Sequence, residues 1–522
     1  MNTPHAILAR IVAPVIMLSL LVAAAPAGAQ DADSAMPGLT TDRRQQTVGE
    51  YDLLPASQTE VELSLRDAVT RALRNHPDLQ ALWHSGDAES MDSQAERSSF
   101  DTFLEAAVAV PVSTDKLVYS KELANVALTR RFTSGVRASL EYHLERDPDG
   151  LFVSENGSSR LYRHRGGLKL VQPLARGRGS DANLALSRAE DLDFQGVAAE
   201  YRRAAKSVVY TVEDAYWRLF AAQQIETVFA EALTAAENLL KISGDQFQAG
   251  ELSRLELTVA EAGVASRRED VILARIETDK ARDALLALLL GSASPSRLSA
   301  DVTLLTLPDT LSSEALNLPS LTDVLANRQD YVSSEMALAA ADEQIKAARN
   351  LGRHRVDLTL EMGYASMGPS LGTEYIDPTT GEAVSGAYVF VGGELGMSLN
   401  GTHARADKHR AAARRRAAHY NREAMARAIV LEIRQARLDL ESSIERIRVT
   451  RTAREAVEEQ LRGERKKFAM GRTTNQSALL YENDLRSARI REIRALADLQ
   501  VAAARLRLAM GTTLDHFDLA LQ

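Results

Sequence analysis

Alternation of apolar and polar residues predicts a set of β-strands. In residues 135–145, every second residue from Val136 to Leu144 is apolar, and the residues between them are polar or charged. This period of two is typical of a strand with one apolar and one polar face. Five further segments share the pattern, strictly at 355–365, more loosely at 386–400 and weakly at 104–112, 123–132 and 164–172.

Long helical patterns lie between and after these strands. A helix is expected from Ser64, with Asp67 three residues later as a capping partner, to about residue 98, with a break at 75–77. Longer patterns cover about 181–248, 253–290, 321–350, 402–468 and 474–510. Apolar residues spaced alternately by three and four form heptad seams at 225–242 and 496–510. A helix of about 65 residues would be roughly 100 Å long, so these helices are expected to need an extended assembly.

Matching segments indicate that the chain contains two copies of one unit. Residues 246–250 correspond to 467–471, the helices that follow end at 290–291 and 510–511, and residues 65–68 match 321–324. We therefore expect a linker at 30–62, a first repeat at 63–291, a second linker at 292–320, a second repeat at 321–512 and a C-terminal tail at 513–522.

Residues 1–29 have the pattern of a secretory signal peptide. Arg10 precedes an apolar stretch at 11–25, and Ala27-Gly28-Ala29 forms a small-residue cleavage site before Gln30. The alternative is an uncleaved membrane anchor, although the apolar stretch is shorter than the roughly 20 residues that a spanning helix needs. No later segment approaches such a length, so a role within a membrane would require a β-barrel.

Composition narrows the function further. The 522 residues carry a net charge of −9, which offers no general attraction for the phosphates of nucleic acids. The chain has no cysteine, which excludes disulfides, thiolate metal sites and cysteine nucleophiles. Aromatic residues make up only 5%, as expected for a chain dominated by long helices.

No motif indicates catalysis, a cofactor or a metal. The ten histidines include no HExxH motif and are interpreted as surface residues. Gly177-Arg178-Gly179 lacks the surrounding βαβ unit of a nucleotide site and is expected to turn a strand into a helix. The run at 414–416 is interpreted as the solvated face of a helix. No nucleophile, base and orienting group occur together, so the chain is not expected to be an enzyme.

The sequence resembles the TolC family of outer-membrane efflux channels. The resemblance covers about residues 63–512 and depends on the order of several short motifs rather than on any one of them. These motifs are 63–68 with 75–79, the strand exit at 170–174, and the two turns at 247–252 and 468–473.

The resemblance implies a membrane β-barrel joined to a long α-helical coiled-coil barrel, in an internally duplicated, trimeric tunnel. It also implies an outer-membrane location in a Gram-negative bacterium, with a periplasmic extension, and partnership with a periplasmic adaptor and an inner-membrane transporter. The family pattern has two strands in each half, whereas the first half here has four candidates. The additional pair is either an extra hairpin or an extended lead-in.

The resemblance also suggests functional residues. Two helix-hairpin turns, expected at the periplasmic tip, would dock the adaptor through Gly250, Glu251, Leu252, Gly471, Arg472 and Thr473. Family members often carry aspartates at a pore constriction, but the corresponding positions here are Ser477 and Leu480. Glu256, six residues after its turn glycine as Ser477 is after the other, is a candidate for a replacement carboxylate ring; the alternative is an ordinary solvated residue.

We therefore expect a passive exit duct for small molecules or proteins, serving a tripartite efflux pump or a type I secretion system. The main alternative is a periplasmic coiled-coil adaptor without a conducting pore, and a secreted enzyme on a helical scaffold is a third. The two long hairpins and the two-faced strands favour the duct. The sequence does not indicate which substrate is exported.

Overall fold

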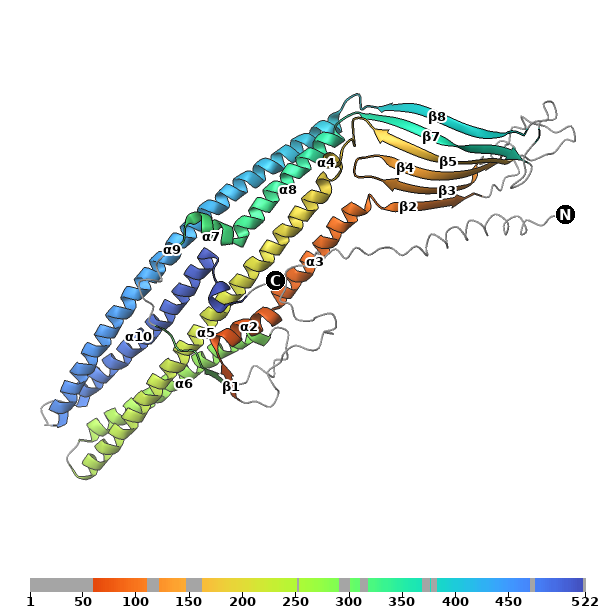
Figure 1. Ribbon diagram of the computed structural model, residues 1–522. Helices are drawn as coiled ribbons and strands as arrows, with labels where there is room; N and C mark the ends of the chain where they lie inside the picture. The colour runs from red at the N-terminus through yellow and green to blue at the C-terminus, as the bar shows by residue number, and fades with distance from the viewer. Residues whose placement is uncertain are drawn as a thin grey trace, which may run out of the picture. The chain divides into compact units, whose positions relative to one another are not determined.

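The computed structural model describes residues 60–109, 122–146, 162–250, 253–290, 301–309, 318–368, 376, 383–469 and 475–519. The signal peptide and most of the first linker lie outside these residues. Figure 1 shows long helices and one large sheet.

The sheet has six antiparallel strands in the order β2-β3-β4-β5-β7-β8. Their bounds are β2 (Thr102–Val108), β3 (Glu122–Arg131), β4 (Arg137–Arg146), β5 (Tyr162–Pro173), β7 (Arg355–Gly368) and β8 (Ser385–Gly396). All six strand predictions are confirmed. Because β2 and β3 pair with each other and β3 pairs with β4, the additional strands are an extra hairpin within the same sheet.

One face of this sheet is apolar along an unbroken row. The directly paired residues of the six strands are Leu104, Leu128, Leu140, Leu168, Met362 and Val389. This face is open: Leu140 is 59% exposed and Val389 is 70% exposed. The opposite face carries charges that pair across strands, with Lys169 Nζ 3.7 Å from a carboxylate oxygen of Glu141. The sheet therefore exposes this apolar row, and its other face carries charged side chains.

Two glycines allow β5 and β7 to approach closely. Gly167 and Gly363 are directly paired, and a Cβ at Gly363 would lie 2.3 Å from the carbonyl oxygen of Gly166. The hydroxyl of Tyr388 on β8 lies beside both glycines and donates a hydrogen bond to Glu361 at 2.9 Å. An aromatic side chain thus covers the gap that the glycines leave.

The helices follow the predicted segments. Their bounds are α2 (Leu65–Asn75), α3 (Pro77–Ser98), α4 (Ser180–Asn183), α5 (Ala185–Gln248), α6 (Arg254–Leu290), α7 (Leu321–Asn327), α8 (Gln329–Leu351), α9 (Thr402–Ala469) and α10 (Asn475–Met510). The Ser64 cap is confirmed, since its hydroxyl accepts the Asp67 N–H at 3.1 Å. Two breaks were not expected: Leu184 separates α4 from α5, and Arg328 separates α7 from α8.

Sequence analysis also missed a small parallel pair of strands, β1 (Glu60–Leu63) and β6 (Asp301–Leu304). Most of β1 lies in the linker predicted at 30–62, and β6 lies in the linker predicted at 292–320. At four residues each, the two strands are too short to show a period. The Tyr216 hydroxyl of α5 contacts both segments: it donates to the Leu63 carbonyl at 3.2 Å and accepts the Thr306 N–H at 2.9 Å.

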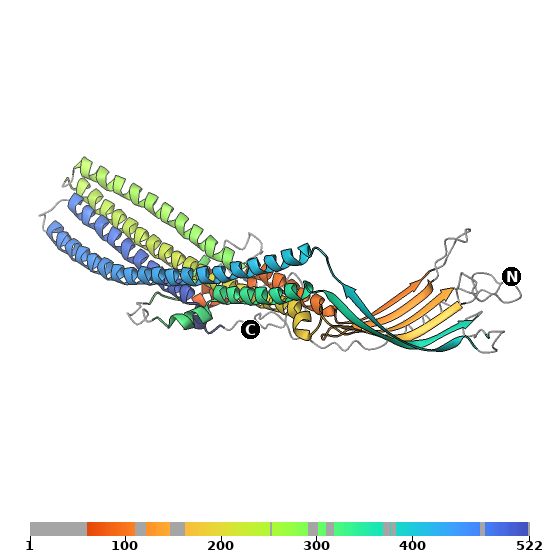
Figure 2. The ribbon, with the colours of Figure 1, turned by 90° about the horizontal axis from the view of Figure 1, so that it is seen from above.

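The helices pack as two hairpins, α5 with α6 and α9 with α10, and α10 also packs against α5 (Figure 2). The seam at 496–510 is confirmed, because Leu499 and Leu506 are buried against Ile429 and Leu440 of α9. The seam at 225–242 is only partly buried: Ile242 is exposed, and Ala236 and Ser243 are buried instead. None of the helices in the described part of the chain is long and apolar enough to cross a membrane.

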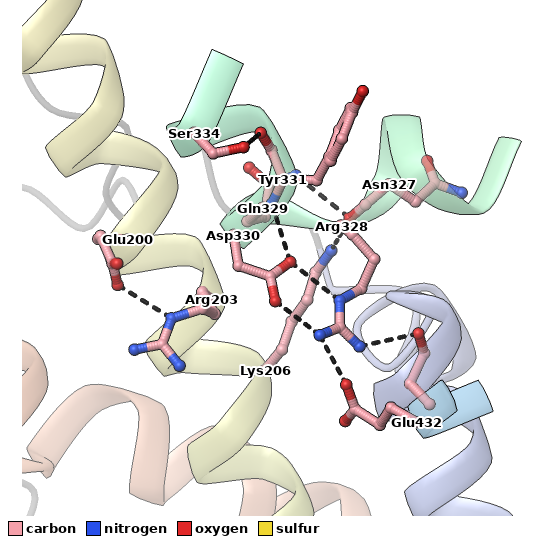
Figure 3. Close-up of polar contacts among 11 residues, drawn as sticks. Glu200, Arg203, Lys206, Asn327, Arg328, Gln329, Asp330, Tyr331, Ser334 and Glu432 are labelled. Carbon is pink, nitrogen blue, oxygen red and sulfur yellow. Dashed lines mark hydrogen bonds and ion pairs between the residues drawn. The ribbon is translucent and has the colours of Figure 1, made fainter. Parts of the chain in front are cut away.

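At the break between α7 and α8, the partly buried Arg328 side chain connects α8 to the hairpin of α9 and α10. The Arg328 guanidinium donates two hydrogen bonds to Asp330, at 2.6 and 3.0 Å, and one to Glu432 of α9 at 2.8 Å (Figure 3). It donates another to the Ala509 carbonyl at 2.9 Å, near the end of α10. Lys206 of α5 adds hydrogen bonds to the carbonyls of Asn327, at 3.1 Å, and Gly511, at 2.7 Å.

Burial and neighbouring charges shift the pKa values of these groups, and for Asp330 they act in opposite directions. Burial alone would raise the pKa of Asp330, but its hydrogen bonds to Arg328 and the charge of that residue lower it overall. Burial lowers the pKa of Lys206. The side chains of Arg328 and Asp330 are both only 12% exposed, so this ion pair is shielded from solvent screening.

We expect Arg328→Gln to destabilise the fold by about 3 kcal/mol, because it leaves a shielded carboxylate without its cation. Unfolding of the detergent-solubilised protein, followed by circular dichroism, measures this. The matched control is Arg437→Gln, which removes an exposed pair with Glu441 and should cost less than about 1 kcal/mol.

Because the pKa of Asp330 is lowered on folding, its contribution to stability is present above the unfolded value of 3.8 and is lost as pH falls through the folded value. The difference between wild type and Arg328→Gln should therefore shrink below pH 3.8. A loss equal to that of the control would contradict the prediction.

We expect Gly363→Ala to lower the stability of the sheet by about 1–3 kcal/mol, since the new methyl group must push β5 away from β7. Gly386→Ala is the control, because no atom lies within 4 Å of the added Cβ at that position. Thermal unfolding midpoints in one detergent compare the two variants. Equal midpoints would show that the close approach of β5 and β7 is not required.

Candidate functional site

The turn between α5 and α6 is built around Gly250. This residue has a φ of 75°, in the left-handed region that favours glycine. Its N–H donates to the Phe247 carbonyl at 3.1 Å, which closes the end of α5. The other residues predicted to form the turns, Glu251, Leu252, Gly471, Arg472 and Thr473, lie outside the described residues.

Glu256 forms the N-terminal cap of α6. Its carboxylate accepts hydrogen bonds from the N–H and the hydroxyl of Ser253, both at 3.2 Å, and the Ser253 hydroxyl accepts the Glu256 N–H at 3.3 Å. This is a reciprocal capping box. The side chain is exposed, so the cap leaves the carboxylate open to solvent. Ser477 lies in the first turn of α10 and is half-buried.

Exposed leucines lie near both hairpin ends. Leu255, in the first turn of α6, is 73% exposed, and Leu480, near the start of α10, is 58% exposed. The guanidinium of Arg254 lies over the Phe247 ring at 6.0 Å, which joins the two sides of the first turn. These leucines were not expected to be contact residues. In the sequence, they could have been found as apolar residues within the first two turns of a helix.

Polar contacts link the two hairpins near these ends. Arg267 of α6 donates to Asn483 of α10 at 2.6 Å, and Arg486 of α10 is paired with Asp270 of α6 at 2.7 Å. A further pair joins Arg489 to Glu231 of α5 at 2.9 Å. These contacts link the two hairpins to each other.

A second polar feature lies where α3 packs against α5. Burial raises the pKa of Glu190, and the neighbouring carboxylates of Asp193 and Glu89 raise it further. Burial also raises the pKa of Asp193. This acidic cluster was not expected from the sequence, because its members come from two helices about 100 residues apart.

Two open grooves lie between the helices of the described residues. One groove of about 620 Å³ lies between α5, α8 and α9, and another of about 530 Å³ lies between α5, α6 and α10. The first is lined mainly by small, polar and charged side chains, and the second also by Ile225, Phe229 and Leu273. Within the ranges that the structure describes, no three His, Asp or Glu residues are arranged to hold a metal ion.

Comparison with known proteins finds a family match in the second half of the chain. Residues 321–512 match the family model described as outer membrane efflux protein. No curated protein matches the sequence significantly.

Solved structures resemble nearly the whole chain. The outer-membrane channel OprN has a TM-score of 0.62 and 18% identity, covering 86% of this chain and 90% of its own. The Campylobacter jejuni CmeC outer membrane channel has a TM-score of 0.61 and 16% identity, covering 86% of each chain. The outer membrane protein VceC of Vibrio cholerae has a TM-score of 0.60 and 15% identity, covering 86% of this chain and 96% of its own. The chain thus matches the outer membrane efflux protein family over residues 321–512 and has the fold of the TolC-type outer-membrane channels, which confirms the resemblance seen in its sequence.

Proposed function

We propose that this protein is an outer-membrane channel, the exit duct of a tripartite efflux pump or a type I secretion system. The observation that carries the proposal is the open apolar row across all six strands, with a charged face behind it. A sheet in water would hide its apolar face. A sheet surrounded by lipid and lining an aqueous passage would arrange its faces as this one does.

The sheet edges support an assembly of several copies. Among the described residues, β2 pairs only with β3 and β8 pairs only with β7, which leaves one edge of each strand unpaired. Unpaired backbone groups within lipid are costly, so the edges require partners. We propose a homotrimer in which three sheets close into one barrel and the long hairpins form a coiled-coil tube.

The resulting duct would be passive and noncatalytic, in the outer membrane of a Gram-negative bacterium with its helices in the periplasm. Energy and cargo choice would come from an inner-membrane transporter, reached through a periplasmic adaptor. The proposed docking surface contains Gly250, Glu251, Leu252, Gly471, Arg472 and Thr473, and the exposed Leu255 extends it. The duct would export small molecules or proteins.

A similar order of elements supports an internal duplication. Ser64 caps α2 through Asp67, and Ser320 caps α7 through Asp323, with N–H to hydroxyl distances of 3.1 and 3.2 Å. The first short helix is followed by another helix, four strands and a long hairpin, and the second by another helix, two strands and a long hairpin. The alternative, a periplasmic adaptor without a pore, does not explain the exposed apolar face of the sheet.

The purified protein should produce stepwise conductance in planar lipid bilayers. If Glu256 lies at the constriction, Glu256→Gln should shift the reversal potential in a salt gradient, because it removes one carboxylate from each subunit. Glu277→Gln is the control, since it removes an exposed carboxylate of the same helix farther from the turn. A silent wild-type protein would contradict the channel. A normal channel with an unchanged reversal potential in Glu256→Gln would exclude only the constriction.

We expect Gly250→Val to impair export while leaving the sheet and the membrane location intact. A β-branched residue at a φ of 75° strains the turn, by about 1–2 kcal/mol or more, and distorts the proposed docking surface. Gly263→Val is the control, because Gly263 has no positive φ and no atom near its added Cβ. Export is measured as substrate retention in cells, with membrane fractionation alongside. Normal export by Gly250→Val would contradict docking at this turn.

A further inference from the structure

Three segments meet where the sheet joins the helices (Figure 1). They are residues 174–179 after β5, 349–354 at the end of α8 and before β7, and 397–410, which follow β8 and include the start of α9. The first two are hydrogen-bonded to each other. The Arg176 N–H donates to the His354 carbonyl at 3.1 Å, and the Gly177 N–H donates to the Asn350 side chain at 3.0 Å. Lys408 of α9 lies against the second segment, since a Cβ at Gly352 would be 2.5 Å from its Cε.

The junction is strongly basic although the whole chain has a net charge of −9. Its cationic residues, here called the basic junction patch, are Arg176, Arg178, Arg349, Arg353, Arg405, Lys408 and Arg410. Asp407 is the one acidic residue in these three segments, and it pairs with Arg410 at 3.3 Å and with His403 at 2.8 Å.

Most of the patch lacks counter-charges. Apart from Arg410, no member of the patch forms an ion pair with any acidic residue in the described ranges. Elsewhere on the helices, many exposed arginines pair with a carboxylate on their own helix, as Arg427 does with Glu423. All seven cationic side chains are exposed. The patch therefore presents an excess of positive charge to its surroundings.

Exposed apolar residues lie among these cations. Leu399 is 92% exposed, and Leu174, Leu351 and Met397 are also exposed. Leu174 continues β5 directly, and its N–H donates to the Val356 carbonyl at 2.7 Å. The alternation of β5 places Leu174 on the same side as Leu168, within the open apolar face. The apolar face of the sheet thus ends in a zone that is both apolar and basic.

We propose that the basic junction patch binds the headgroups of anionic phospholipids in the periplasmic leaflet of the outer membrane. The inference rests on the proposed outer-membrane placement, in which the helical end of the sheet faces the periplasm. Long basic side chains can keep their alkyl stems against lipid while their charges reach the headgroups. Clustered Lys and Arg beside an apolar membrane surface favour anionic lipids. The patch would hold the duct at a set depth in the membrane.

The test uses the full-length protein in detergent, titrated with a fluorescently labelled phosphatidylglycerol and, separately, with labelled phosphatidylcholine. We expect wild type to prefer phosphatidylglycerol by about tenfold or more, and the preference to weaken at high salt. The combined variant Arg176→Gln, Arg353→Gln and Lys408→Gln should lose most of this preference. The matched control removes three paired cations farther along α9, with Arg427→Gln, Arg437→Gln and Arg462→Gln, and should keep it.

Three results would overturn the proposal. These are an undiminished preference in the patch variant, an equal loss in the control variant, and displacement of the lipid by an equal concentration of soluble glycerol 3-phosphate. Equal unfolding midpoints of the two variants verify that the patch variant is folded. Conductance in pure phosphatidylcholine bilayers tests the channel separately, so a failed lipid preference with normal conductance counts against the patch alone.

Discussion

The exposed apolar row across six strands limits where this protein can be stable and how it can assemble. Leu140, Leu168 and Met362 occupy directly paired positions on the exposed face, while Glu141 and Lys169 face the other way. In water, such a face would drive aggregation, since burial of apolar area is the dominant favourable term in folding. Within lipid the same face is satisfied, but the free strand edges then need further copies of the chain. The proposed membrane location and assembly both follow from this one arrangement.

The long helices must also stay in a fixed axial register with one another. Small residues such as Ala436 and Ala503 let α9 and α10 approach closely, and Leu499 and Leu506 fill the seam between them. Apolar seams alone allow sliding by one heptad. Arg328 opposes such sliding, because its four hydrogen bonds reach α8, α9 and the end of α10 at defined positions. We therefore expect this partly buried cation to contribute to the register of the helices as well as to stability.

The proposed functional surfaces lie at the two ends of the helical hairpins. At the turns, Gly250 and the Glu256 cap shape an end that also exposes Leu255. At the junction with the sheet, unpaired cations lie among exposed apolar residues. We propose a protein partner for the first surface and a membrane leaflet for the second, as a duct that spans from one to the other would require.

The sequence by itself determined the elements, because strand alternation and heptad spacing are local properties. The six strands, the Ser64 cap and the seam at 496–510 could all be read from residues close together in the chain. Only the tertiary structure decided that β2 and β3 extend the same sheet, since pairing between strands depends on contacts distant in sequence. It also decided the parallel pair β1–β6, the Arg328 contacts and the basic junction patch. Each of these joins segments separated by many residues, so no periodicity along the chain could have shown them.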